Sequence, residues 1–337
     1  MILNESDNTN NVGNQSLEFA GRTGKHTLTL AHISDPHISC MKAVRVRHLF
    51  SKRLFGFLKW NLHRGREHEI KVLEALQNDL SQTRPDQIAV TGDLTHLSLP
   101  AEFKEARRWL QTLGPPEKVT IVPGNHDVYV KNGRRENLAH WTDYMLSDNT
   151  RPEEHGAGDP GAIFPSLRVR GPVALIGVCT ARPSAPHLAV GSIGAPQMQK
   201  LASILTAAAE QELFRVILIH HPPASGAVNW RKRLTDAAAL QALIERYGSE
   251  LILHGHAHRH FQSFLKTPSG KVPVMGAPSV SSLGRTPGRR ARYYIYRIVA
   301  GADGHDVSVA VRIYSPEENR FILEDKHQFG KNHWPRL

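Results

Sequence analysis

Short apolar runs that each end in a polar cluster are the feature that most constrains the fold of this chain. The run from Lys118 to Val122 leads directly into Pro123-Gly124-Asn125-His126-Asp127. An amide, an imidazole and a carboxylate at the end of a buried strand are costly unless something binds them. Asn and Asp also cap helices well, so this stretch alone is compatible with either a binding site or a helix start.

Four further clusters of the same chemistry favour the binding site. They are Asp35-Pro36-His37, Gly92-Asp93, His220-His221-Pro222-Pro223 and His254-Gly255-His256-Ala257-His258. Residues i and i+2 of an extended segment point the same way, so Asp35 and His37 can reach one ion. Imidazole and carboxylate ligands without thiolate suit Mn, Fe, Zn or Co better than Ca. The sequence therefore predicts a metal site at strand ends.

The order of the expected elements indicates an α/β fold. Strand, helix, strand, helix, strand at the start is typical of parallel βαβ units, in which ligands gather at the carboxyl ends of strands. Expected strands cover 27–34, 86–91, 119–122, 163–170, 173–179, 214–219 and 251–253, followed by an antiparallel group at 261–265, 272–275, 292–299 and 307–314. Expected helices cover 67–83, 100–113, 134–146, 196–213 and 235–247.

These clusters, taken in order, resemble the blocks of the calcineurin-like metallophosphoesterase superfamily. Those blocks read D-x-H, G-D, G-N-H-[DE], H and G-H-x-H, and the match runs from about Leu28 to at least His258. The stretch His220-His221-Pro222-Pro223 resembles the same four-residue string in class III cyclic nucleotide phosphodiesterase-type members of this superfamily. The resemblance implies a four-layer αββα sandwich of two mixed β-sheets flanked by helices.

The resemblance also implies a site with two divalent or trivalent metal ions. The first ion would be held by Asp35, His37, Asp93 and His258, and the second by Asp93, Asn125, His220 and His256, so that Asp93 bridges. His126 and Asp127 are the expected catalytic residues. His126 would contact the phosphoryl group and protonate or stabilise the leaving oxygen, while Asp127 would help to fix the turn.

Four residues are weaker candidates for contact with substrate: His96, His221, Arg289 and Arg290. Many superfamily members carry an acidic residue at the place of His96, paired with the catalytic histidine, and a loop position and a substrate contact are equally open for His96. His221 would support the metal ligand His220 without binding the metal itself. Arg289 and Arg290 could clamp a second phosphate with their forked donors, or lie in a solvated loop.

The remaining histidines carry less weight. His254 is expected as a structural, hydrogen-bonding residue. His32, His48, His63, His140, His155 and His187 are expected as surface or loop residues.

Residues 41–66 form a basic amphipathic segment. Eight Lys and Arg residues alternate there with aromatic and aliphatic ones, and no acidic residue occurs. A cap insertion packed over the cleft is favoured, because amphipathic helices bury their apolar stripe internally more often than in lipid. A peripheral contact with an anionic membrane is the alternative.

Around this segment we expect a disordered N-terminal stretch at 1–26, a metallophosphoesterase domain at 27–315 and a C-terminal tail at 316–337. The N-terminal stretch has no apolar h-region, which favours a cytoplasmic protein, peripheral to a membrane if residues 41–66 bind lipid.

The net charge of +11 favours anionic partners such as phosphate esters. The expected activity is dinuclear-metal-dependent phosphoric ester hydrolysis, in which a metal-bridging hydroxide attacks a small phosphodiester such as a cyclic nucleotide in line. A phospholipid or glycolipid phosphodiesterase or pyrophosphatase is the alternative, as in the UDP-diacylglucosamine hydrolases of this superfamily. A nuclease and a non-catalytic scaffold rank lower, since no stacking platform for nucleic acid is evident and every ligand is present. The sequence assigns no oligomeric state.

Overall fold

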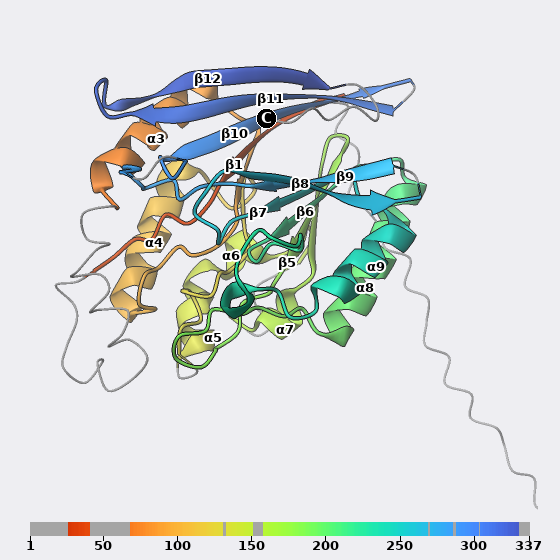
Figure 1. Cartoon of the computed structure of the whole chain (residues 1–337), viewed down its shortest axis with the longest axis horizontal. Helices are drawn as coiled ribbons and strands as arrows, with labels where there is room; N and C mark the ends of the chain where they lie inside the picture. Colours follow the sequence, from red (N-terminus) through yellow and green to blue (C-terminus); the bar gives the residue numbers. More distant parts are fainter. Residues whose placement is uncertain are drawn as a thin grey trace, which may run out of the picture.

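The protein is built on two six-stranded mixed β-sheets packed face to face, shown in the computed structural model of Figure 1. The structure describes residues 26–40, 68–130, 133–150, 158–268, 270–285, 288–302 and 304–329. The basic segment at 41–66 and the stretch 1–25 lie outside these ranges, so the expectations for them stay predictions.

The first sheet has the order β12-β11-β10-β1-β2-β3. Its strands are β1 (Thr27–Ile33), β2 (Gln87–Val90), β3 (Val119–Ile121), β10 (Arg292–Gly301), β11 (Gly304–Ser315) and β12 (Arg320–Phe329). Strands β1, β2 and β3 run parallel, and β10 to β12 form an antiparallel meander that joins β1. The parallel βαβ start predicted from the sequence is therefore present.

The second sheet has the order β4-β5-β6-β7-β9-β8. Its strands are β4 (Ser166–Arg170), β5 (Val173–Val178), β6 (Phe214–Ile219), β7 (Leu251–His254), β8 (Phe261–Thr267) and β9 (Gly270–Gly276). Strands β5, β6, β7 and β9 are parallel, and the two edge strands are antiparallel to their neighbours.

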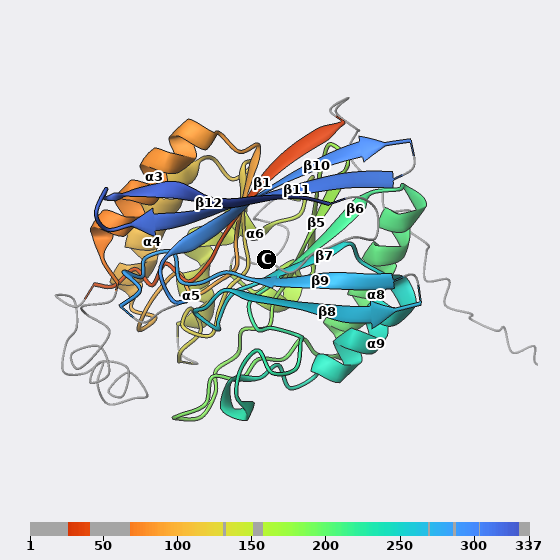
Figure 2. The ribbon, with the colours of Figure 1, turned by 45° about the horizontal axis from the view of Figure 1, so that its top comes forward.

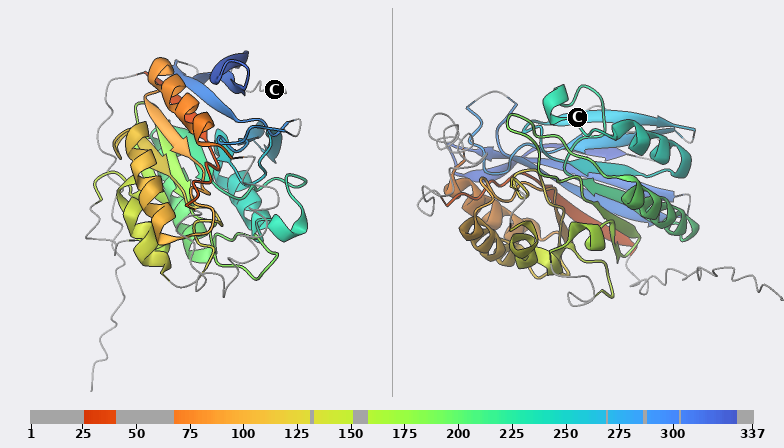
Figure 3. Two further views of the ribbon diagram at one scale, coloured as in Figure 1. Left: turned by 90° about the vertical axis from the view of Figure 1, so that its left-hand side faces the viewer. Right: turned by 90° about the horizontal axis from the view of Figure 1, so that it is seen from below.

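Helices cover the outer face of each sheet. The helices are α3 (Ile70–Thr83), α4 (Pro100–Leu113), α5 (Arg134–Leu138), α6 (Thr142–Met145), α7 (Pro160–Ile163), α8 (Ala195–Glu210) and α9 (Ala237–Tyr247), with 3-10 turns η3 (Ala139–Trp141) and η5 (Trp230–Lys232). Figure 2 shows α8 and α9 beside the second sheet, and the left view of Figure 3 shows α3 and α4 on the opposite side of the molecule. The predicted αββα sandwich is confirmed.

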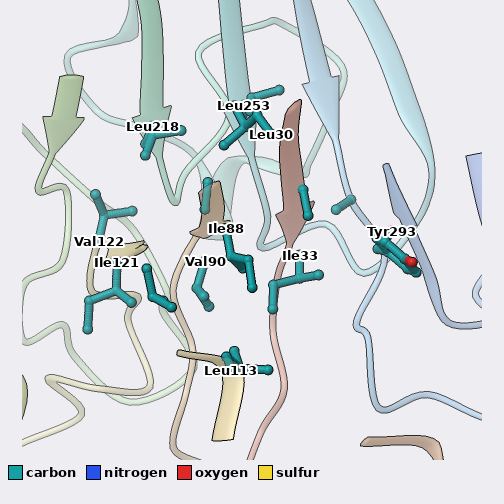
Figure 4. Close-up of a cluster of buried hydrophobic side chains, with 14 of the residues drawn as sticks. Leu30, Ile33, Ile88, Val90, Leu113, Ile121, Val122, Leu218, Leu253 and Tyr293 are labelled. Carbon is teal, nitrogen blue, oxygen red and sulfur yellow. The ribbon is translucent and has the colours of Figure 1, made fainter. Parts of the chain in front are cut away.

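Side-chain alternation along the strands separates two apolar layers. In β6, Val216 and Leu218 face the space between the sheets, whereas Ile217 and Ile219 pack with the residues of α8 and α9. Figure 4 shows Leu218 and Leu253 of the second sheet approaching Leu30 and Ile88 of the first. This period of two buries both faces of the central strands, which explains why these strands read as almost continuous apolar runs.

Three local expectations were wrong. The helix predicted over 134–146 is divided into α5, η3 and α6, and the Trp141 ring in η3 stacks on Phe103 at a centroid distance of 4.6 Å. The strand predicted from Ile163 starts at Ser166, after the short helix α7. Residues 320–329, placed in the expected C-terminal tail, form β12 and pair with β11.

The described helices include none with the length and apolar character needed to cross a bilayer.

Candidate metal centre

The predicted metal ligands come together where the carboxyl ends of five parallel strands meet. Asp35 and His37 follow β1, Asp93 follows β2 and Asn125 follows β3, while His220 and His256 follow β6 and β7 of the other sheet. Hydrogen bonds join the sheets at this point, two of them made by ligand histidines. His220 Nδ1 donates to the Thr91 carbonyl at 2.7 Å, and the His256 backbone N–H donates to Asp35 Oδ2 at 3.0 Å.

The first donor set consists of Asp35, His37, Asp93 and His258, with donor atoms all within 4.8 Å of one another. His37 Nε2 lies 3.7 Å from Asp35 Oδ1 and 3.8 Å from Asp93 Oδ2. His258 Nε2 lies 3.2 Å from Asp35 Oδ1 and 3.0 Å from His37 Nε2. Four ligand atoms from three separate segments of the chain are therefore close enough together to bind one metal ion.

The second donor set contains Asp93, His220 and His256, again within 4.8 Å of one another. His220 Nε2 lies 3.4 Å from Asp93 Oδ2 and 3.3 Å from Asn125 Oδ1, which brings the amide oxygen of Asn125 to the same point. All seven predicted ligands are therefore gathered, and Asp93 belongs to both sets.

The sharing of Asp93 is reflected in its electrostatics. Burial opposes ionisation of this carboxyl group, but the neighbouring His220 and His126 hold its pKa well below the usual range. Conversely, the Asp93 carboxylate overcomes the effect of burial on His220 and raises the pKa of that imidazole to about 9. The centre therefore keeps a buried carboxylate ionised between its two donor sets.

Backbone strain is concentrated at these ligands. Asp35, His37, Asp93, His256 and His258 all have φ between 46° and 67°. This left-handed region is uncommon for residues with a side chain and costs energy. Such strain clusters at functional sites, where the surrounding structure holds side chains in a required geometry.

The residues present fit a pair of metal ions. Asp35 Oδ1 is buried and accepts no hydrogen bond among the described residues, although it faces two imidazoles. Three ligand histidines donate their other ring N–H to a backbone carbonyl: His37 to Thr95 (3.3 Å), His220 to Thr91 (2.7 Å) and His256 to Lys232 (3.0 Å). This arrangement fixes the tautomer that turns a lone pair toward a metal.

His126 stands at the edge of the first donor set. Its Nδ1 donates to the backbone carbonyl of His96 at 2.6 Å. Its ring packs edge-on against His37 at a centroid distance of 4.9 Å and is stacked on Tyr129 at 5.3 Å. The imidazole predicted as the catalytic acid is thus oriented by the main chain.

Asp127 holds the loop after β3 in place, and its predicted catalytic role stays a prediction. Its carboxylate is fully buried and accepts hydrogen bonds from Gly124 N (2.8 Å), Thr95 N (2.8 Å) and Thr95 Oγ1 (3.0 Å). Burial and the nearby Asp93 raise the pKa of Asp127 to about 7. The side chain ties the loop after β3 to the loop after β2, as the sequence analysis expects for fixing the turn.

Three other histidines are buried parts of the fold. His221 donates from Nε2 to Ala189 and accepts at Nδ1 from Thr180, and its predicted contact with substrate stays a prediction. His254 Nδ1 donates to the Gly255 carbonyl at 2.9 Å, in keeping with a structural role. His32, expected at the surface, is buried in β1 beside Thr91, and burial lowers its pKa to about 3.

The remaining candidates lie around the centre. His96 is buried and forms, with His37 and His126, a third group whose donor atoms lie within 4.8 Å of one another. Arg289 is exposed and lines a pocket of about 420 Å³ together with Lys232, Ala257 and Arg259. Arg290 is half-buried and packs against Gly284 outside this pocket's lining.

Three residues near the centre are not among the predicted ones: His68 and the two pocket cations Lys232 and Arg259. The His68 ring lies 5.1 Å from His37 and 6.1 Å from His258, and its Nδ1 is 2.7 Å from Ser281 Oγ. Arg259 could have been found, because it directly follows the last metal motif. No local pattern singles out His68 or Lys232.

Comparisons with known proteins agree with this geometry. The sequence profile of a family described as calcineurin-like phosphoesterase matches residues 28–260. The glycerophosphodiester phosphodiesterase GpdQ of Enterobacter lignolyticus is 32% identical over 100 residues, which covers only 30% of this chain and 30% of that protein.

Two solved structures share the fold. A dimetal phosphatase from Danio rerio aligns with a TM-score of 0.56 at 13% identity, covering 88% of this chain and 98% of that one. The purple acid phosphatase PPD1 from yellow lupin (Lupinus luteus) aligns with a TM-score of 0.55 at 10% identity, covering 90% of this chain and 53% of that one. At such low identity these two likenesses bear on the fold alone.

Proposed function

Because this chain belongs to the calcineurin-like phosphoesterase family, we propose that it is a dinuclear-metal-dependent phosphodiesterase acting on a small phosphodiester. The observation that carries this proposal is the sharing of Asp93 by two donor sets built from the ends of five strands. The donors are nitrogen and oxygen atoms without thiolate, so the proposed ions are Mn, Fe, Zn or Co. When bound, two such ions supply Lewis-acid charge to the phosphoryl oxygens and lower the pKa of a water molecule toward neutrality.

The side chains around the donors would orient substrate and move a proton. His126 Nδ1 donates to the His96 carbonyl, and Nε2, when protonated, would donate to the leaving oxygen. Proton transfer from a positioned imidazole typically contributes about 10²-fold to 10⁴-fold in rate. Asp127 and Thr95 hold the loop that carries His126, so that this imidazole stays beside the first donor set.

A diester is favoured over a monoester by the matching segment of the glycerophosphodiester phosphodiesterase and by the His and Pro doublets at 220–223. Cyclic nucleotides and glycerophosphodiesters are both small diesters of this class. Either would bring one negative charge to the centre.

The test is hydrolysis by the purified protein with Mn(II), comparing bis(p-nitrophenyl) phosphate, p-nitrophenyl phosphate, a cyclic nucleotide and a glycerophosphodiester. We expect a clear diester preference that is lost in Asn125→Ala and kept in Asn78→Ala, whose side chain is exposed on α3. Equal activity of Asn125→Ala and the unmodified protein would contradict the proposal.

A lipid-linked phosphoester is the second candidate, favoured by an exposed aromatic side chain. Trp230 on η5 is 62% exposed, and Arg231 lies over its ring at 5.2 Å. Aromatic and cationic side chains together suit the interface of an anionic membrane. Sedimentation with phosphatidylglycerol vesicles that weakens in Trp230→Ala would support this candidate, and absence of sedimentation would contradict it.

A further inference from the structure

A pocket of about 420 Å³ lies directly beside the second donor set. Its lining includes Lys232, Ala257, Arg259 and Arg289. Ala257 stands between the two histidines of the last metal motif, and the Lys232 carbonyl is hydrogen-bonded to His256 Nε2 at 3.0 Å. Two lining residues, Lys232 and Ala257, therefore adjoin the metal ligand His256.

The pocket is lined by three cationic side chains and no carboxylate. Among the described residues, Arg259 and Arg289 form no ion pair with Asp or Glu. Elsewhere the arginines of this fold are commonly paired, as Arg215 is with Glu250 and Arg312 with Asp79. Arg259 and Arg289 are exposed, so their mutual repulsion is weak in water, and an anion bound between them would be attracted by both.

Arg259 is fixed in place at the pocket wall. Its Nη2 donates to the backbone carbonyls of Gly226 (3.1 Å) and Ala227 (3.0 Å), and its guanidinium lies over the Phe261 ring at 5.6 Å. These contacts use one nitrogen and one face of the guanidinium. A guanidinium held in this way is ready to make charge-assisted hydrogen bonds to phosphate or carboxylate with little loss of side-chain entropy.

Lys232 links the pocket to the metal centre. Its backbone carbonyl is hydrogen-bonded to His256 Nε2 at 3.0 Å, and the residue lines the pocket together with Arg259 and Arg289. An anion in the pocket would therefore meet one ammonium and two guanidinium groups.

We propose that Lys232, Arg259 and Arg289 form a subsite for a second anionic group of the substrate, separate from the phosphodiester that is hydrolysed. This inference rests on the proposed function of the neighbouring metal centre. It narrows the substrate class to phosphodiesters or pyrophosphates that carry an additional phosphate or carboxylate. A diester with only neutral substituents would leave the subsite without its anion.

The kinetic test uses two chromogenic esters that differ by one phosphate. These are thymidine 5′-(p-nitrophenyl phosphate) and the same compound with a 3′-phosphate. We expect the unmodified protein to have the higher kcat/KM for the 3′-phosphorylated ester. In Arg259→Ala and in Arg289→Ala, the ratio of the two kcat/KM values should fall about tenfold, as for loss of one charge-assisted contact.

Arg231→Ala is the matched control, because Arg231 is exposed on the same loop as Lys232 but does not line the pocket. Its ratio should stay within about twofold of the unmodified protein's. An equal loss for both esters in the pocket variants, or the same fall in ratio in Arg231→Ala, would show a general effect of positive charge and overturn the subsite.

A binding test separates the subsite from the proposed activity. Isothermal titration of the metal-loaded protein compares methylphosphonate with diphosphonates joined by one, two or three methylene groups. At least one diphosphonate should bind more tightly than methylphosphonate, and Arg289→Ala should remove only that advantage. If this holds but neither ester is hydrolysed, the subsite stands and the proposed function fails. If the esters are hydrolysed but no diphosphonate gains affinity, the function stands and the subsite is wrong.

Discussion

His126 Nδ1 lies 2.6 Å from the backbone carbonyl oxygen of His96, so a main-chain group orients the imidazole predicted as the catalytic acid. The family resemblance implies that many members carry an acidic residue three positions after the bridging aspartate, paired with the catalytic histidine. This chain has His96 at that place. A carbonyl acceptor is supplied by any residue at that position. The departure in sequence therefore leaves the orientation of His126 intact.

We expect His126→Ala to lower kcat for a phosphodiester by about 10²-fold to 10⁴-fold, because it removes the proton donor to the leaving oxygen. Its metal content should stay equal to that of the unmodified protein, since the imidazole belongs to neither of the two principal donor sets. Steady-state kinetics and metal analysis by mass spectrometry measure both quantities. His187→Ala, at an exposed position, is the control. Loss of metal in His126→Ala would show that the imidazole is a ligand.

The division of ligands into two sets predicts how metal is lost. His258→Ala and His256→Ala each remove a donor from a different set, so each should retain about one ion per chain after gel filtration. Asp93→Ala removes the shared carboxylate and should lose both ions. Elemental analysis of the three variants checks the assignment. Loss of both ions in His258→Ala and in His256→Ala alike would contradict two separable sets.

Much of this centre is predictable because each ligand follows an apolar run. The carboxyl ends of parallel strands meet at one edge of a sheet, so polar residues that follow these strands are brought together by the fold. The left-handed backbone at Asp35, Asp93 and His256 is not predictable in this way. It arises from the tight loops that turn each side chain toward the centre. A glycine would indicate such a conformation in the sequence, but these three positions carry other residues.

Other features depend on long-range packing. His32 is predicted as a surface or loop residue, but β1 lies in the middle of its sheet and the side chain is buried. Strand β12 follows a turn at 316–319 and pairs with β11 alone, at the edge of the sheet. Charged residues are common on edge strands, so its composition resembles a tail.

Gly124 is required by the close approach of two loops. A Cβ atom at this position would lie 2.2 Å from Asp93 Oδ1 and 2.4 Å from Asp93 N. Gly124→Ala should therefore displace the shared carboxylate, with loss of metal and of at least about 10²-fold in kcat/KM. Gly161→Ala is the control, because its Cβ would meet only Asp159 Oδ1 at 3.5 Å. Unchanged metal content in Gly124→Ala would show that the loops can separate without cost.

Glu102 gives the protein a pH-dependent stability that is separate from the metal centre. Its buried carboxyl group accepts hydrogen bonds from Leu97 N (2.8 Å) and Leu99 N (3.0 Å) at the start of α4. Burial outweighs these donors and raises its pKa from 4.5 to about 7. The folded protein therefore binds this proton more tightly than the unfolded chain does. The resulting stabilisation is fully present below about pH 4.5 and is lost as the pH rises through about 7.

Glu102→Gln keeps an oxygen acceptor for the two N–H groups and removes the titration. Relative to this variant, the free energy of unfolding of the unmodified protein should fall by about 2.5 kcal/mol between pH 5 and pH 8. Urea unfolding followed by circular dichroism, with EDTA present so that metal binding does not contribute, measures the difference at each pH. Other titrating groups change equally in both proteins and cancel. A difference that stays constant from pH 5 to pH 8 would mean that Glu102 is ionised throughout, with its charge carried by the backbone donors of the loop before α4.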